Sequence, residues 1–418
     1  MSLSFKRWKA VCFRPQKQSV CSARTMEASE KFSQFERYIR TLCNIIGFDV
    51  MTETWKKSYR TYISIFLCSQ YLILMVYSLI IASDTFELFK SLSFLGFFFQ
   101  CSLKMYYTIQ QAPQYAVNFC CLKEAIYERH SKGTLAQKTT VARIIDLLVL
   151  VTKAISVLYT SSLFIFSLYP AYMYFVVHVK VPIFPLYIPG INIYSAYGYG
   201  ITNSFHMLIA VYGLFGALTS DIVFIMFVVH FVTYGGLFKI ECEQFDQDLS
   251  GVFQHCEWRT AVYKTFCRQR MRAIYQYHQS VIFYLESMQE CYRNICVVQV
   301  ASCSLSTVFN LFLALTTDWY ATYGFIVISV FQLFVYCLMG TVMQIMNERM
   351  IDYISNLPWY MLPTEEQKQF KFMLARSQLS AEIMIRSVGP MNMETFTDIM
   401  QKMYSAFAMM YSFLVDLG

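Results

Sequence analysis

The chain has 418 residues, of which 56% are apolar, 17% aromatic and only 15% charged, a composition that excludes an ordinary soluble enzyme. The net charge of +7 does not indicate a nucleic-acid partner. The excess basic residues flank long apolar stretches, where anionic lipid and membrane topology account for them. The composition therefore predicts an all-α membrane protein.

Residues 1–61 are predicted to form a cytoplasmic N-terminal region. The first 25 residues are basic and contain no apolar core of the kind a signal peptide needs. From Glu27 to Tyr62 the sequence alternates acidic, basic and aromatic residues, as an amphipathic helix at the membrane surface does. We therefore divide the chain into this region, with a membrane-surface helix, and a membrane domain over residues 62–418.

Seven apolar stretches follow, and each is long enough to cross a hydrocarbon core, which takes about 20 residues of helix. They cover residues 62–83, 91–110, 147–170, 203–233, 295–316, 322–343 and 396–415. The segment 171–202 contains several prolines and tyrosines, which predict a rigid irregular cap over a cavity. Apolar residues at helical spacing in 235–294 predict that the neighbouring spans continue as long cytoplasmic helices packed on one another.

The last span is expected to follow a separate cytoplasmic helix. Pro358 ends the helix of the sixth span, and a second helix is predicted from Glu365 to Ile385. Gly389 and Pro390 then end this helix before the seventh span begins. The seventh element is therefore predicted in two pieces, one cytoplasmic and one in the membrane.

Basic residues fix the predicted orientation. Lys and Arg lie almost entirely in residues 1–61, 111–146, 235–294 and 344–395, and the exceptions are Lys90, Lys104, Lys153, Lys180 and Lys402. The positive-inside rule then places the N-terminus in the cytoplasm and, after seven spans, the C-terminus outside. This orientation is opposite to that of G-protein-coupled receptors. The chain also lacks an Asp-Arg-Tyr sequence after its third span and an Asn-Pro-x-x-Tyr sequence in its seventh.

Motifs for enzymatic chemistry are absent from the sequence. It has no HExxH, GxSxG, GxxxxGK[ST] or post-strand GxGxxG pattern, so no catalytic residue, metal site or cofactor is predicted. A membrane-embedded enzyme or transporter that uses His206 or Lys153 remains an alternative. A transporter is expected to show inverted repeats with broken helices, and the sequence shows none.

Several short runs, in this order, resemble the insect odorant receptor family from about Met26 to the end. They are Tyr336-Cys337-x-x-Gly340, Leu357-Pro358-Trp359-Tyr360, the helix Gln367 to Ser387 and the run Met403 to Met410. Gustatory receptor channels of the same fold are the alternative, but their last span carries a glutamine after the Thr-Tyr pair, which is missing after Tyr404. The shared odorant co-receptor is longer in the loop corresponding to 235–294. The resemblance therefore favours a ligand-tuning subunit.

The resemblance implies a heterotetrameric, odorant-gated, non-selective cation channel in the dendritic plasma membrane of olfactory sensory neurons. Its partners are the co-receptor subunit, a small volatile ligand, membrane lipid and permeating cations, with no cofactor. The ligand is expected among the outer halves of spans two to six, at Phe94, Phe98, Tyr159, Ser162, Phe166, His206, Ala210, Ser304, Val308 and Leu311. The last span is expected to line the pore, with the gate and outer mouth at Phe407, Met410, Tyr411, Leu414 and Asp416.

Overall fold

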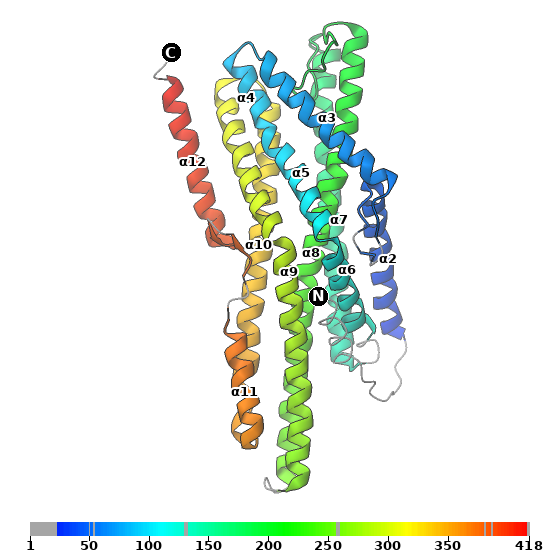
Figure 1. The fold of residues 1–418 in the computed structure, drawn as a ribbon, viewed down its shortest axis with the longest axis vertical. Coiled ribbons are helices and arrows are strands. Elements are labelled where there is room, and N and C mark those ends of the chain that lie inside the picture. Colours follow the sequence, from blue (N-terminus) through cyan, green and yellow to red (C-terminus); the bar gives the residue numbers. More distant parts are fainter. Residues whose placement is uncertain are drawn as a thin grey trace.

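The computed structural model describes residues 23–49, 51–52, 55–128, 133–255, 260–379, 382–385 and 388–415. These residues form an elongated helical bundle with one small hairpin (Figure 1). The elements are α2 Ala23–Ile46, α3 Tyr59–Ile81, α4 Thr85–Ser93, α5 Leu95–Gln110, α6 Ala112–Leu122, the π-helical turn Lys123–Glu128, α7 Leu135–Phe175, α8 Ala196–His255, α9 Ala261–Thr316, α10 Ala321–Ser355, the 3-10 turn Trp359–Met361, α11 Thr364–Ser377, β1 Met384–Ile385, β2 Gly389–Pro390 and α12 Met393–Val415.

The predicted spans fall on helices, but the helices differ from them in length. The second span is divided at Phe94, which ends α4 and precedes α5. The third span lies within a longer helix, α7, that continues through Pro170. By length and hydropathy, four segments among the described residues qualify to cross a membrane: Tyr59–Ile81, Ala196–Phe253, Ala261–Thr316 and Ala321–Met361. The count of seven spans therefore stays a prediction.

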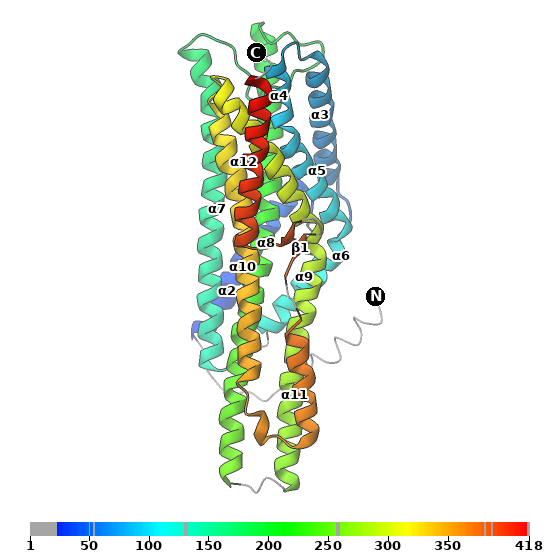
Figure 2. The same ribbon diagram turned by 90° about the vertical axis from the view of Figure 1, so that its left-hand side faces the viewer.

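The predicted extension of the spans into long helices is confirmed. Helix α8 continues without a break through Gly235 and Gly236 to His255, and α9 begins at Ala261. The two run side by side below the rest of the bundle, with α11 beside α9 (Figure 2). We call residues 235–294 and 344–377 the stalk, and the opposite end of the bundle, with residues 176–195, the cap end.

The prediction of one helix from Glu365 to Ile385 is wrong at its C-terminal end. Helix α11 stops at Ser377, and the chain then forms the antiparallel β1–β2 hairpin, in which Met384 pairs with Pro390. Gly389 has a φ of +117°, a conformation that L side chains rarely adopt. The hairpin buries Ile385 and leads directly into α12.

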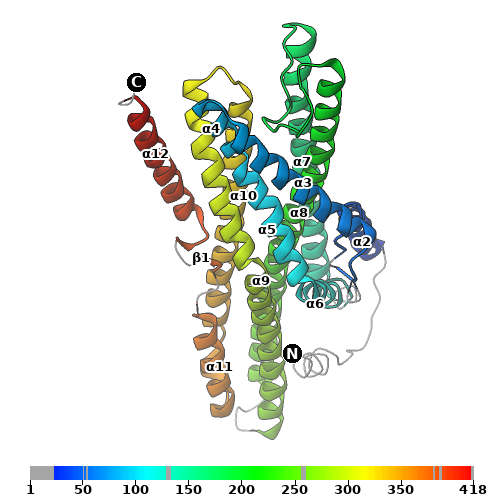
Figure 3. The same ribbon diagram turned by 45° about the horizontal axis from the view of Figure 1, so that its top comes forward.

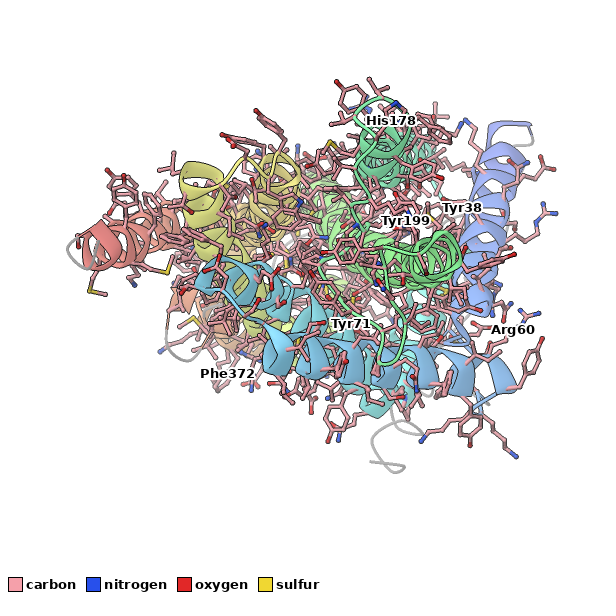
Figure 4. The ribbon with its side chains drawn as sticks, turned by 90° about the horizontal axis from the view of Figure 1, so that it is seen from above. Tyr38, Arg60, Tyr71, His178, Tyr199 and Phe372 are labelled. Carbon is pink, nitrogen blue, oxygen red and sulfur yellow. The ribbon has the colours of Figure 1, made fainter. Side chains whose placement is uncertain are left out.

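The first and the last described helices, α2 and α12, lie on opposite sides of the bundle when it is seen from above (Figure 4). Helix α2 is amphipathic, as predicted, but it ends at Ile46 rather than at Tyr62, which lies in α3. It packs its apolar face on α7 and α8 through residues such as Phe32, Phe35 and Ile39. Helix α12 contacts α9 and α10 on the other side, and its C-terminal half diverges from them (Figure 3). The main core lies between these two helices, around the middle of α8, α9 and α10.

Candidate functional site

A cavity of about 440 Å³ opens among α3, α5, α7, α8 and α10. This volume lies within the range of roughly 300–1,000 Å³ that is typical of sites for small molecules. The walls consist mainly of apolar and aromatic side chains from five helices, including Leu67, Tyr71, Phe97, Phe98, Leu163, Phe166, Ile209, Ala217, Phe325, Ile328 and Phe331. The cavity is therefore suited to a small, largely apolar molecule.

Six of the ten predicted ligand residues line this cavity. They come from the start of α5, from α7 and from α8: Phe94, Phe98, Tyr159, Ser162, Phe166 and Ala210. Stacked and edge-to-face rings fix the aromatic wall, with 4.4 Å between the centres of the stacked rings of Phe166 and Phe325 and 5.0 Å between those of the edge-to-face rings of Phe94 and Phe325. Such pairs hold the wall in one shape beyond what burial alone does.

The three predicted residues on α9, Ser304, Val308 and Leu311, are not among the cavity-lining residues. Helix α9 packs tightly against α5, since a Cβ on Gly96 would lie 2.5 Å from the carbonyl oxygen of Ser302. The two helices are in direct contact at this point. Helix α10 lines the cavity with several residues, and α9 lines it through Tyr292.

His206 also lies outside the lining, directly behind Phe184, with 5.5 Å between the ring centres. Its Nδ1 accepts a hydrogen bond from the Phe184 backbone N–H at 3.4 Å. Nδ1 is then unprotonated in the neutral ring, and Nε2 carries the proton. The geometry gives this histidine a role in holding the chain segment that covers the cavity.

The cap over the cavity is tied to three helices. The Ile183 N–H donates to Asn203 Oδ1 on α8 at 2.9 Å, and the Tyr187 N–H donates to Ser78 Oγ on α3 at 2.7 Å. Ser91 Oγ on α4 donates to the Pro185 carbonyl at 3.3 Å. Ile183 and Phe184 of this segment line the cavity, which confirms the predicted covering of a cavity by the proline-rich segment. Tyr71 lies beneath it, on the side of α3 that faces the bundle (Figure 4).

The other end of the cavity is polar and contains a buried ion pair. Lys104 Nζ on α5 lies 3.0 Å from Asp221 Oδ1 on α8 and 3.0 Å from the Tyr336 hydroxyl on α10. The side chains of Lys104 and Asp221 are 5% and 6% exposed, so the pair is shielded from water. Tyr336 donates to Asp221 Oδ1 at 2.8 Å, and Tyr159 donates to Asp221 Oδ2. The network joins four helices at one point.

Three glutamines extend this network toward α9. Gln332 Nε2 donates to the Tyr159 hydroxyl, and Gln100 Nε2 donates to Gln332 Oε1, both at 2.8 Å. Gln100 Nε2 also lies 3.2 Å from Gln299 Oε1. Lys104, Gln100, Tyr159 and Gln332 all line the cavity, while Asp221 lies behind them.

The sequence analysis did not identify Lys104 and Asp221 as site residues. A signal was available, because each is an ionisable residue within a predicted apolar span, and such residues usually pair with each other or mark a functional site. Their pairing was not available, since 117 residues separate them in the sequence.

No group of three or more His, Cys, Asp or Glu side chains among the described residues is arranged to hold a metal ion. Cys43, Cys68 and Cys101 line the cavity as free thiols. Burial, with a smaller effect from Asp49, raises the pKa of the Cys43 thiol on α2 to about 12. This thiol is therefore neutral at physiological pH and contributes to the wall as a small apolar group.

The predicted pore residues lie on or just beyond α12. Near its start the helix is packed into the bundle, with Ile399 and Met403 buried and Phe396 5.8 Å from Phe334 between ring centres. Further along, Phe407 and Met410 are half-buried and Tyr411 is exposed. The Leu414 side chain and Asp416 lie outside the described residues.

The long apolar helices and the covered cavity define a helical, multi-pass membrane receptor for a small molecule. Residues 84–404 match the family described as 7tm odorant receptor, and the chain belongs to this family. Members of the family are receptors rather than enzymes. The chain is 23% identical to odorant receptor 83c of Drosophila melanogaster over 397 residues, which is 91% of this chain and 97% of that protein.

Solved structures show the same fold. The olfactory receptor OR5 of Machilis hrabei in complex with eugenol superposes with a TM-score of 0.74 at 11% identity, and the match covers 92% of this chain and 99% of that one. A second structure of OR5, described without a ligand, gives a TM-score of 0.70 at 11% identity and covers 91% and 98% of the two chains.

Proposed function

We propose that this chain is the ligand-tuning subunit of a heteromeric, odorant-gated, non-selective cation channel. The observation that carries the proposal is the covered apolar cavity within a member of the odorant receptor family. Burial of apolar surface supplies the binding energy for a volatile molecule, at roughly 25 cal/mol per Å² removed from water. The co-receptor subunit completes the channel, which lies in the dendritic plasma membrane of olfactory sensory neurons.

The experiment that tests this function is current recording from cells that express the chain with and without an odorant co-receptor, under a panel of volatile compounds. A current that needs the chain, the co-receptor and a compound is expected. Currents with the same ligand profile in cells that express the co-receptor alone would contradict the proposal.

Filling the cavity should change its ligand range. Ala210→Phe adds a ring to the cavity wall on α8, so we expect large odorants to lose potency about tenfold while the smallest agonists keep theirs. Dose–response curves over compounds of increasing size measure this. Leu208→Phe, at an exposed position on the same helix, is the matched control and should leave the curves unchanged. Equal curves for Ala210→Phe and the unaltered chain would place the ligand elsewhere.

The orientation in the membrane follows from the basic residues. With the stalk and the N-terminal region in the cytoplasm, the cap end and the last residue face outward. An epitope tag after residue 418 should therefore stain on unpermeabilised cells, and a tag before residue 1 should stain only after permeabilisation. The reverse pattern would overturn the topology.

Helix α12 is proposed to line the pore. Tyr404 and Met409 are 67% and 61% exposed on the isolated chain, and large apolar side chains on such a face need a partner or lipid to cover them. Four such helices around one axis would form an apolar constriction that excludes ions until it is wetted, with Asp416 near its outer mouth. The other subunits of the channel would supply the remaining faces.

Making the constriction polar should open it. Phe407→Ser or Met410→Ser is expected to raise the current measured without odorant by severalfold, since a polar group lowers the cost of wetting. Asp416→Asn should weaken permeation or block by divalent cations. A cysteine scan from Ala406 to Leu414 in which no position responds to an aqueous thiol reagent would exclude α12 from the pore.

A further inference from the structure

The polar end of the cavity holds a donor that its own network does not use fully. A lysine ammonium has three N–H groups. Among the described residues, the structure gives Lys104 Nζ two hydrogen-bond partners, Asp221 Oδ1 and the Tyr336 hydroxyl. Lys104 also lines the cavity. One N–H group therefore remains for a molecule inside it.

The neighbouring polar groups are already engaged with one another. The Tyr159 hydroxyl donates to Asp221 and accepts from Gln332 Nε2. Gln332 Oε1 accepts from Gln100 Nε2. Both oxygens of Asp221 accept hydrogen bonds from protein groups. Lys104 is thus the cavity-lining group of this network whose strong, charged donor is only partly satisfied.

We infer that Lys104 is a specificity-determining residue of the cavity and that its ammonium binds an oxygen acceptor on a neutral odorant. The inference rests on the proposed function. The ligand class is a small molecule with an apolar body and one acceptor oxygen at its end, such as an alcohol, a ketone or an ester. The apolar body lies among Phe98, Phe166 and Phe325, and the oxygen points to Lys104.

The charges around the cavity determine which class of ligand can bind. Lys104 and Asp221 together carry no net charge. A protonated amine would meet the ammonium and be repelled. A carboxylate would bring an uncompensated charge into a site of low dielectric constant, at a high desolvation cost. A hydrocarbon leaves the third N–H without a partner, and a neutral oxygen satisfies it with a charge-assisted hydrogen bond.

The test compares chemical forms of one carbon skeleton. An activating compound from the odorant panel supplies the skeleton, and its hydrocarbon, alcohol, ketone, carboxylic acid and amine forms are applied to cells expressing the chain with the co-receptor. We expect the alcohol or ketone to be at least tenfold more potent than the hydrocarbon, the acid and the amine. Equal potency of the hydrocarbon would overturn the inference. If no compound of the panel evokes a current, the proposed function is overturned instead.

The variant Lys104→Met/Asp221→Leu removes the donor and its counter-charge together, so no buried charge is left unpaired. We expect its preference for oxygen over hydrocarbon to fall about tenfold, with surface expression measured alongside. Tyr127→Phe is the matched control, because it removes a buried hydroxyl that is hydrogen-bonded to His230 at 2.9 Å, away from the cavity. It should keep the preference. An unchanged preference in the double variant would overturn the inference.

A second double variant provides the test if the first one does not reach the cell surface. Lys104→Gln/Asp221→Asn keeps polar side chains of similar size at both positions and removes both charges. A neutral amide is a weaker donor than an ammonium, so the preference for oxygen should fall by a smaller factor. A preference equal to that of the unaltered chain would show that the lysine charge does not contact the ligand.

Discussion

Asp221→Leu alone should abolish surface expression. The substitution leaves the Lys104 ammonium buried without its counter-ion, in a network that joins α5, α7, α8 and α10. Breaking a buried ion pair by removing one partner costs about 3–5 kcal/mol, a large part of the stability of an ordinary domain. Surface labelling of the tagged chain measures the loss.

Two further variants test whether the loss of surface expression comes from the broken buried ion pair or from the removal of any charge. Lys104→Met/Asp221→Leu, which removes both charges, should recover most of the surface signal. Asp146→Asn breaks the exposed pair of Asp146 with Lys31, in which the side chains are 57% and 37% exposed. Exposed pairs contribute little, so expression should not change. Wild-type expression of Asp221→Leu would mean that Lys104 is stably accommodated without this carboxylate.

Gly340→Ala should disconnect α12 from the bundle. A Cβ at this position of α10 would lie 1.7 Å from the Met391 carbonyl oxygen and 2.8 Å from its carbonyl carbon. Both atoms belong to the backbone between the hairpin and α12, which cannot rotate away as a side chain does. Overpacking of this kind costs about 1–3 kcal/mol or more. We expect the odorant-evoked current to fall at least tenfold.

The control for this substitution is Gly251→Ala in the stalk. A Cβ there meets no atom within 4 Å, and alanine stabilises a helix by about 0.5–1 kcal/mol relative to glycine. Current and surface expression of this variant should match those of the unaltered chain. A normal current in Gly340→Ala would show that the hairpin can shift without consequence for α12.

Much of the helical framework follows from the sequence because long apolar stretches and helical spacing have one structural solution in a membrane protein. The stalk was predictable for this reason, as Ile274, Tyr277 and Val281 recur on one helix face. The hairpin could not be predicted from the sequence. Strands of two residues are too short to show an alternating pattern, and their neighbours continue a helical one.

The cavity was predictable only in part. Helix α9 is apolar or small on most faces near Ser304 and Val308, so its hydropathy does not reveal which face meets α5 and which meets open space. The packing at Gly96 decides this, and it depends on the relative position of two helices far apart in the sequence. The same holds for Lys104 and Asp221, whose pairing exists only once α5 and α8 lie together.

Helix α8 connects distant parts of the molecule mechanically. Its 60 residues form one unbroken helix, about 90 Å long at 1.5 Å per residue. Ala210 near one end lines the cavity, Asp221 anchors the middle, and the other end forms the tip of the stalk. A rigid rod held at its middle acts as a lever, so a tilt of a few degrees imposed at the cavity becomes a displacement of a few ångströms at the far tip. One continuous helix thus links the cavity wall to the far tip of the stalk.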